Sequence, residues 1–126
     1  MDSVSLAELG TTLLQKARSN KAGRAARTIH GGREHVLRQT LIALAAGRHL
    51  GEHDTPEEAT LQVLSGQVRL HCADRQVWVG RTGEYVVIPP VRHDLGALDE
   101  AVVLLTSTVT PHRVTSQVPS EQEGES

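Results

Sequence analysis

Two histidines, His53 and His93, are the residues whose type and placement in this chain most directly suggest chemistry. They flank a run of short apolar segments that could form a small β-barrel, and the interior of such a barrel would bring their side chains together. Imidazole nitrogens bind transition metals such as iron, manganese, nickel, copper and zinc. The pair therefore predicts either a metal site or two polar groups that line the barrel interior and bond to backbone or water.

A metal site would need ligands beyond the two histidines, because catalytic zinc sites normally keep three protein ligands. Glu57 and Glu58 follow His53 closely, and a local shift could turn one of them inward, with Glu58 as the preferred third ligand. His49 precedes His53 by four positions, so strand alternation could place both on one face. The residues predicted to contact a bound ligand are Thr55, Gln62 and His49.

Composition and charge argue against several classes of function. The 126 residues suit one domain, and Trp78 and Tyr85 are the only Trp, Tyr or Phe residues, so the core must be aliphatic. A net charge of -2 and so few aromatic rings argue against nucleic-acid binding. No apolar run has the length of a membrane span or signal peptide, and Cys72 is the only cysteine. We therefore expect a cytoplasmic protein with no nucleic-acid or membrane partner.

An amphipathic helix is predicted over residues 4–20. Ser5 fits the N-cap position, and Glu8, three residues later, fits a capping box. The apolar stripe of this helix consists of Leu6, Leu9, Leu13 and Leu14. Because the stripe needs a surface to bury against, we expect a homodimer, with folding back onto its own barrel as the alternative. Residues 21–34, which are rich in glycine and polar residues, predict a connector.

Short strands separated by turn signals fill the middle of the chain. The expected strands are residues 36–46, 60–64, 67–72, 76–79, 85–88 and 101–109. Residues 67–72 alternate, which places Val68, Leu70 and Cys72 on one apolar face. Pro89 ends the fifth of these strands because it removes a backbone donor. This pattern favours an antiparallel sandwich or barrel.

Three polar positions and the C-terminal tail carry weaker predictions. Asp94 follows His93 directly and could orient an imidazole, but adjacent residues on a strand point to opposite faces. Ser107 and His71 are expected on exposed strand surfaces. Residues 115–126 are rich in Ser, Gln and Glu, and we expect them to be disordered.

The chain resembles a small single-domain cupin over about residues 35 to 110. Cupins carry a first motif of the form G-x5-H-x-H-x3-4-E-x6-G. In this sequence Gly47 opens that motif, His53 takes the first histidine place and Gly66 closes it. Thr55 occupies the second histidine place and Ala59 the glutamate place.

The second cupin motif, G-x5-P-x-G-x2-H-x3-N, is also recognisable. Gly83 and Pro89 match it, and Val91 occupies the place of a glycine. His93 arrives one residue early, and Ala97 or a neighbour takes the place of the asparagine. The positions that build the barrel therefore match better than the positions that would hold a metal.

The resemblance implies an all-β fold, a cupin-like antiparallel β-barrel or jelly roll with a short N-terminal helix. The expected organisation is an N-terminal arm and connector over residues 1–34, a barrel over 35–112 and a tail over 113–126. In cupins with a full site, three histidines and one carboxylate hold a divalent metal. Here Thr55 and Ala59 take two of the four ligand places, and neither is a good ligand for these ions.

Two functions follow from this resemblance. We expect a barrel that binds a small molecule or assists another protein, with a degenerate metal site. The alternative is a metal-dependent enzyme, an oxygenase, isomerase or lyase, in which His53 and His93 are ligands and Glu58 or Glu57 is the third. A purely structural or regulatory role has no motif in its favour.

Overall fold

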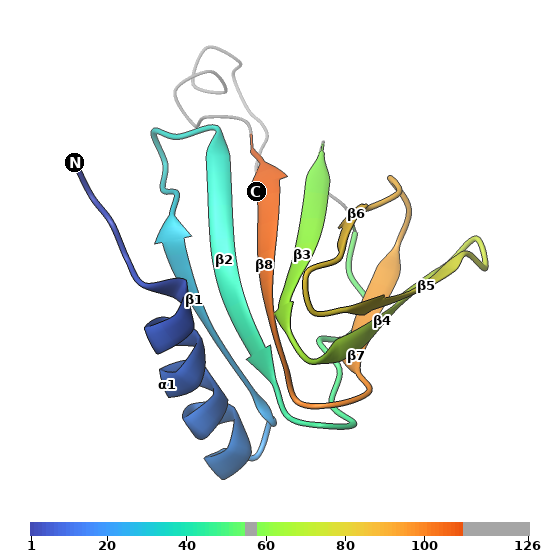
Figure 1. Cartoon of the computed structure of the whole chain (residues 1–126). Helices are drawn as coiled ribbons and strands as arrows, with labels where there is room; N and C mark the ends of the chain where they lie inside the picture. Colours follow the sequence, from blue (N-terminus) through green and yellow to red (C-terminus); the bar gives the residue numbers. More distant parts are fainter. Residues whose placement is uncertain (55–57, 110–126) are drawn as a thin grey trace.

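The computed structural model describes residues 1–54 and 58–109 (Figure 1). A short helix precedes a succession of strands, and the helix lies beside the first two of them. The elements are α1 (Leu6–Ser19), β1 (Arg24–His30), β2 (Leu37–Leu44), β3 (Ala59–Ser65), β4 (Gln67–Cys72), β5 (Val77–Arg81), β6 (Tyr85–Val87), β7 (His93–Ala97) and β8 (Ala101–Thr108). No helix in these described residues is long and apolar enough to cross a membrane.

The strands form two antiparallel sheets. One sheet has the order β1-β2-β8-β3-β6 and the other the order β5-β4-β7. Aliphatic side chains from both sheets pack between them in a single core cluster, which includes Leu44, Val63, Val68 and Val103. The expected antiparallel all-β barrel with a short N-terminal helix is confirmed.

Helix α1 begins and packs as its sequence predicts. The backbone N–H of Glu8 donates to the Ser5 side chain at 3.1 Å, which confirms the N-cap. Leu9 and Leu13 are buried against Leu41 and Ala43 on the outer face of the five-stranded sheet. The leucine stripe is therefore covered by its own chain, which was the alternative to burial in a dimer.

Two strands are absent from the sequence-based prediction. The segment expected to be a connector contains β1, which pairs with β2, so the larger sheet begins at Arg24 rather than near residue 35. No residue of β1 is fully buried, and an edge strand of this kind lacks the apolar alternation that reveals other strands. Strand β7 was also missed, because Asp94 and Gly96 interrupt its apolar residues.

The turn residues of the barrel behave as expected. Gly66 and Gly83 both have φ of 90°, a backbone conformation that favours glycine. A Cβ at Gly66 would also clash with the carbonyl oxygen of Glu100, so the turn needs glycine for space as well. Strand β6 ends at Val87, two residues before Pro89.

Candidate ligand-binding pocket

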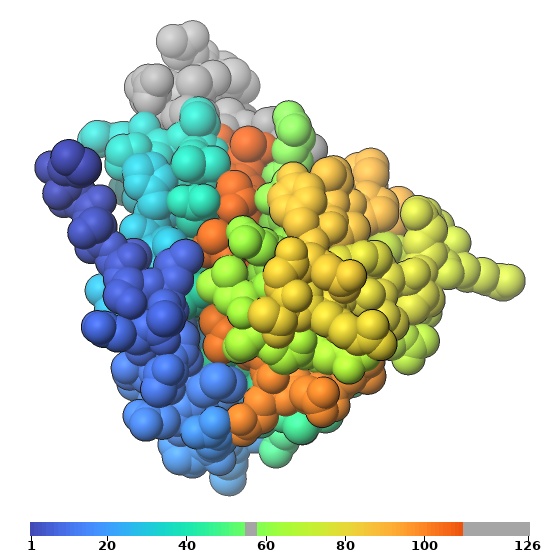
Figure 2. Space-filling model, in the orientation of Figure 1, coloured from blue at the N-terminus to red at the C-terminus, as the bar shows by residue number. Residues whose placement is uncertain are grey.

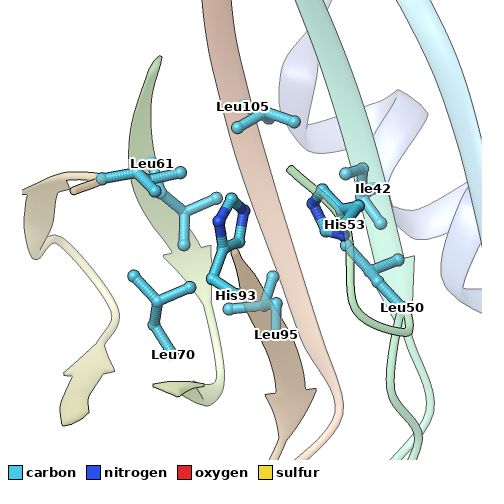
Figure 3. Close-up of a pocket in the computed structure, with 9 residues that line it drawn as sticks. Ile42, Leu50, His53, Leu61, Leu70, His93, Leu95 and Leu105 are labelled. Atoms are coloured by element: carbon cyan, nitrogen blue, oxygen red, sulfur yellow. The ribbon is translucent and has the colours of Figure 1, made fainter. Parts of the chain in front are cut away.

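The structure brings His53 and His93 side by side between the two sheets (Figure 3). The backbone N–H of each residue donates to the carbonyl of the other, at 2.9 and 3.0 Å. Their rings meet edge to face, with centroids 4.4 Å apart and planes inclined by 67°. Two imidazoles, one from β7 and one from the segment after β2, therefore meet at one point of the barrel interior.

Backbone contacts fix how each imidazole presents its nitrogens. Nδ1 of His53 lies 2.8 Å from the carbonyl oxygen of Gly51, and Nδ1 of His93 lies 3.0 Å from that of Val91. A carbonyl oxygen only accepts, so both Nδ1 atoms carry the hydrogen and donate. Nε2 of each ring is then the atom that can accept a hydrogen bond or coordinate a metal.

The rest of the pocket is aliphatic. The hollow measures about 240 Å³, a volume that includes open solvent, and its enclosed part measures about 10 Å³. The enclosed part therefore has room for about one water molecule and is far smaller than the volumes of about 300–1,000 Å³ that are common for ligand sites. The lining residues other than the two histidines are Ile42, Leu50, Leu61, Leu70, Ile88, Leu95 and Leu105.

Two other residues predicted from the sequence do not lie in the pocket. Gln62 is exposed on the outer face of β3, on the side opposite to the buried Leu61 and Val63. Glu58 is exposed, and its backbone N–H donates to the hydroxyl of Thr108 at 3.1 Å. Two further predicted positions, Thr55 and Glu57, lie outside the described residues. Within residues 1–54 and 58–109, no group of three His, Cys, Asp or Glu side chains is placed to hold a metal ion.

His49 lies on the opposite face of the sheet from His53, against the expectation from strand alternation. His49 pairs with Gly96 and His53 pairs with His93, so four residue steps on one strand face three on the other. The extra residue is a β-bulge, and Gly51 within it has φ of 94°. One added residue reverses which face each later side chain occupies.

Asp94 holds His49 on that outer face. Nδ1 of His49 donates to one carboxylate oxygen of Asp94 at 2.9 Å, and the N–H of Gly51 donates to the other at 2.9 Å. Asp94 therefore orients an imidazole, as the sequence suggested it could, but the imidazole is that of His49 and not of His93.

Polar residues lie on the inner face beyond Leu105, toward the end where β2 begins and β8 ends in Figure 1, and the sequence did not predict them as part of a site. This end, one row beyond the pocket lining, is called the upper rim. Ser107 was expected on an exposed strand surface, yet it is 7% exposed. It shares the inner face with Leu105, two residues earlier on β8, and pairs in register with Arg38 on β2. The alternation of β8 around the core residue Val103 could have revealed this position.

Comparison of the sequence with known proteins gives no match. No protein-family model matches the chain, and no curated protein matches it.

Many solved structures are similar to this one. A conserved protein of unknown function from Streptococcus pyogenes is 22% identical, with a TM-score of 0.66 over 86% of this chain and 88% of that one. A cupin superfamily protein from Desulfitobacterium hafniense is 12% identical, with a TM-score of 0.63 over 69% and 78%. A salicylate 1,2-dioxygenase from Pseudaminobacter salicylatoxidans is 16% identical, with a TM-score of 0.66 over 88% of this chain and 35% of the enzyme.

These similarities define the class of the fold. The chain has the cupin fold, an antiparallel β-barrel that is found both in uncharacterised proteins and in enzymes among its structural neighbours. A fold shared at such identities carries no activity with it, because function depends on the site and not on the barrel.

Proposed function

We propose that this protein is a cupin-fold barrel that binds a small molecule in the pocket above His53 and His93, without catalysing a reaction. The observation that carries the proposal is the paired imidazoles, whose Nδ1 hydrogens are both committed to backbone carbonyls. A concave, mainly apolar pocket with a few convergent polar groups is the usual form of a small-molecule site. Here the polar groups are the imidazoles of His53 and His93.

The size of the pocket limits its ligand. The enclosed part of the hollow, about 10 Å³, admits about one water molecule, so a ligand of a few carbon atoms would lie largely in the open part. Leucine and isoleucine side chains form the walls, so this body should be apolar. A hydrogen-bond donor on the ligand would meet Nε2 of His53.

A metal-dependent enzyme is the second candidate, and the same paired imidazoles favour it. Nε2 of His53 and of His93 would hold the ion, and an ion in that position would act as a Lewis acid. Two imidazoles are one fewer than the three protein ligands that catalytic zinc sites keep. The third ligand that we predicted, Glu58, is exposed, so the described residues fit a metal only incompletely.

Metal analysis of protein purified without an affinity tag or chelator separates the two candidates. The samples are the wild type, the His53→Ala, His93→Ala double variant and a His71→Ala control, since His71 is exposed on the outer face of β4. Inductively coupled plasma mass spectrometry measures the metal, and titration with isobutyramide, followed by NMR at the pocket leucine methyl groups, measures binding of a small apolar molecule.

The binding proposal expects no near-stoichiometric metal, because two imidazoles are fewer ligands than catalytic zinc sites keep. It also expects isobutyramide shifts that the double variant loses. Near-stoichiometric metal that the double variant loses and His71→Ala keeps would show a metal site at the two histidines and favour the enzyme candidate instead. No isobutyramide shift in the wild type would overturn the binding proposal.

We also propose a homodimer in the cytoplasm. Because α1 covers the outer face over β1 and β2, the remaining outer face over β8, β3 and β6 is the surface that a second copy could cover. In Figure 2, atoms of β8 are visible between the helix and the strands β3 to β6. Tyr85 and Val87 are exposed there, and light scattering of Tyr85→Lys beside the wild type tests whether this face forms a dimer.

A further inference from the structure

We propose that the upper rim of the pocket binds the carboxylate of a small organic acid, and that Arg38 and Ser107 hold it. The inference rests on the proposed function, because the apolar body of the acid would occupy the pocket above His53 and His93. It adds the chemical class of the ligand and two binding residues outside the pocket lining.

The register of the larger sheet places both residues at the rim. Arg38 and Ser107 are cross-strand partners, as are Thr40 and Leu105 one row lower. All four share the inner face with the core residue Val103. Since Leu105 lines the pocket and two residues along a strand span about 7 Å, Arg38 and Ser107 lie one row above the pocket wall.

Ser107 carries the strongest indication of a ligand. Its residue is more than nine-tenths buried, and within the described part of the chain its hydroxyl has no hydrogen-bond partner. Buried polar groups are nearly always hydrogen-bonded, because leaving one unpaired destabilises the folded state. A ligand oxygen at the rim would accept the hydrogen of this hydroxyl.

Arg38 supplies the positive charge. Its side chain is exposed, and it forms no ion pair among residues 1–54 and 58–109. The Arg38 Cγ lies 3.5 Å from the position that a Cβ on Gly31 would take, so the stem passes beside Gly31. A guanidinium can pair with a carboxylate through two parallel hydrogen bonds.

The arrangement of these groups matches a small carboxylic acid. A cation and a hydroxyl lie one row beyond Leu105, and the two imidazoles lie among the aliphatic lining residues, with Leu105 on one side of them and Leu70 and Leu95 on the other (Figure 3). A carboxylate held at the rim would direct a branched apolar body of three or four carbons toward Leu61, Leu105 and the histidines.

Isobutyrate and isobutyramide provide a matched pair of probes, because they have the same shape and differ in charge. Their affinities are measured by NMR titration for wild type, Arg38→Gln, Ser107→Ala and an Arg69→Gln control. Arg69 is an exposed arginine on the outer face of β4, remote from the rim. The far-ultraviolet circular dichroism of each variant checks that it is folded.

We expect the wild type to bind isobutyrate about tenfold more tightly than isobutyramide, since charge-assisted hydrogen bonds are about twice as strong as neutral ones. Arg38→Gln should remove this preference, Ser107→Ala should reduce it and Arg69→Gln should keep it. Equal affinity for both probes in the wild type, or a preference that survives Arg38→Gln, would overturn the inference and leave the proposed function intact. Binding of neither probe would overturn both.

Discussion

The lower end of the barrel is filled with aliphatic side chains, whereas the upper end of the same strands carries polar ones. Leu44, Val63 and Val103 are 0% exposed in the lower half, where β2 ends and β8 begins. Four residues farther along β2 and β8, the inner face carries Thr40 and Ser107 instead. Both ends belong to the same two sheets with the same strand register. The difference in polarity between them therefore comes from the side chains and not from the backbone.

This division assigns separate tasks to the two ends. Close packing at the lower end stabilises the barrel, because buried branched side chains contribute the largest share of folding free energy. The upper end leaves a hollow that packs less well and carries the hydroxyl groups of Thr40 and Ser107. A binding site requires such a hollow, and a firmly packed opposite end offsets the stability that the hollow costs.

Truncating one leucine at each end of the barrel tests most directly whether the two ends differ in packing. Leu44→Ala leaves a cavity in the closed end, and we expect the free energy of unfolding to fall by about 2–5 kcal/mol. Leu105→Ala removes a half-buried wall of an existing hollow, so its loss should be smaller, about 1–2 kcal/mol. Urea unfolding measures both, and equal losses would show that the two ends are packed alike.

The sequence was sufficient to predict the structure where a feature depends only on residues close together in the chain. The N-cap at Ser5, the alternation of residues 67–72 and the turn at Gly66 all follow from side-chain type and spacing, and the structure has each of them. The cupin motifs, which include Gly66, also predicted the barrel. These features need no knowledge of the remainder of the chain.

The sequence was insufficient where a position depends on a distant partner. The edge strand β1 is recognisable only through its pairing with β2, because its own residues are mostly exposed. The bulge near Gly51 depends on the register with β7, and it decides that His49 faces outward while His53 faces the pocket. The burial of Ser107 likewise depends on the pairing of β8 with the strands on both sides of it, β2 and β3.

A second test contrasts two hydroxyls on one strand. Ser107→Ala removes a buried hydroxyl without a partner in the described residues, so we expect unfolding to become harder by about 1 kcal/mol. Thr106→Val removes the acceptor of a 3.3 Å hydrogen bond from Gln39, so we expect a loss of about 0.5–1 kcal/mol. Thermal unfolding of the two variants measures these changes, and destabilisation by Ser107→Ala would indicate that its hydroxyl is already satisfied.

The smallest expected effect concerns the arginine that is paired at the lower end, in contrast to Arg38 at the rim. Arg18 donates to both carboxylate oxygens of Glu100, at 2.6 and 2.7 Å, which joins α1 to the turn before β8. The hydrogen bond from Arg18 lowers the pKa of the Glu100 carboxyl below its usual value. A lowered pKa in the folded state means that the stabilisation is present above the ordinary glutamate pKa and is lost as the pH falls through the folded value.

Stability measured by urea unfolding between pH 7 and pH 3 should therefore decline slightly more for the wild type than for Arg18→Gln, in which the pair is absent. The difference should be small, because both side chains are exposed and solvent screens the interaction. Arg38→Gln should show no such difference from the wild type, since Arg38 has no carboxylate partner among the described residues. If Arg38→Gln also flattened the pH dependence, the rim arginine would be engaged in an ion pair, and its availability to a ligand carboxylate would be refuted.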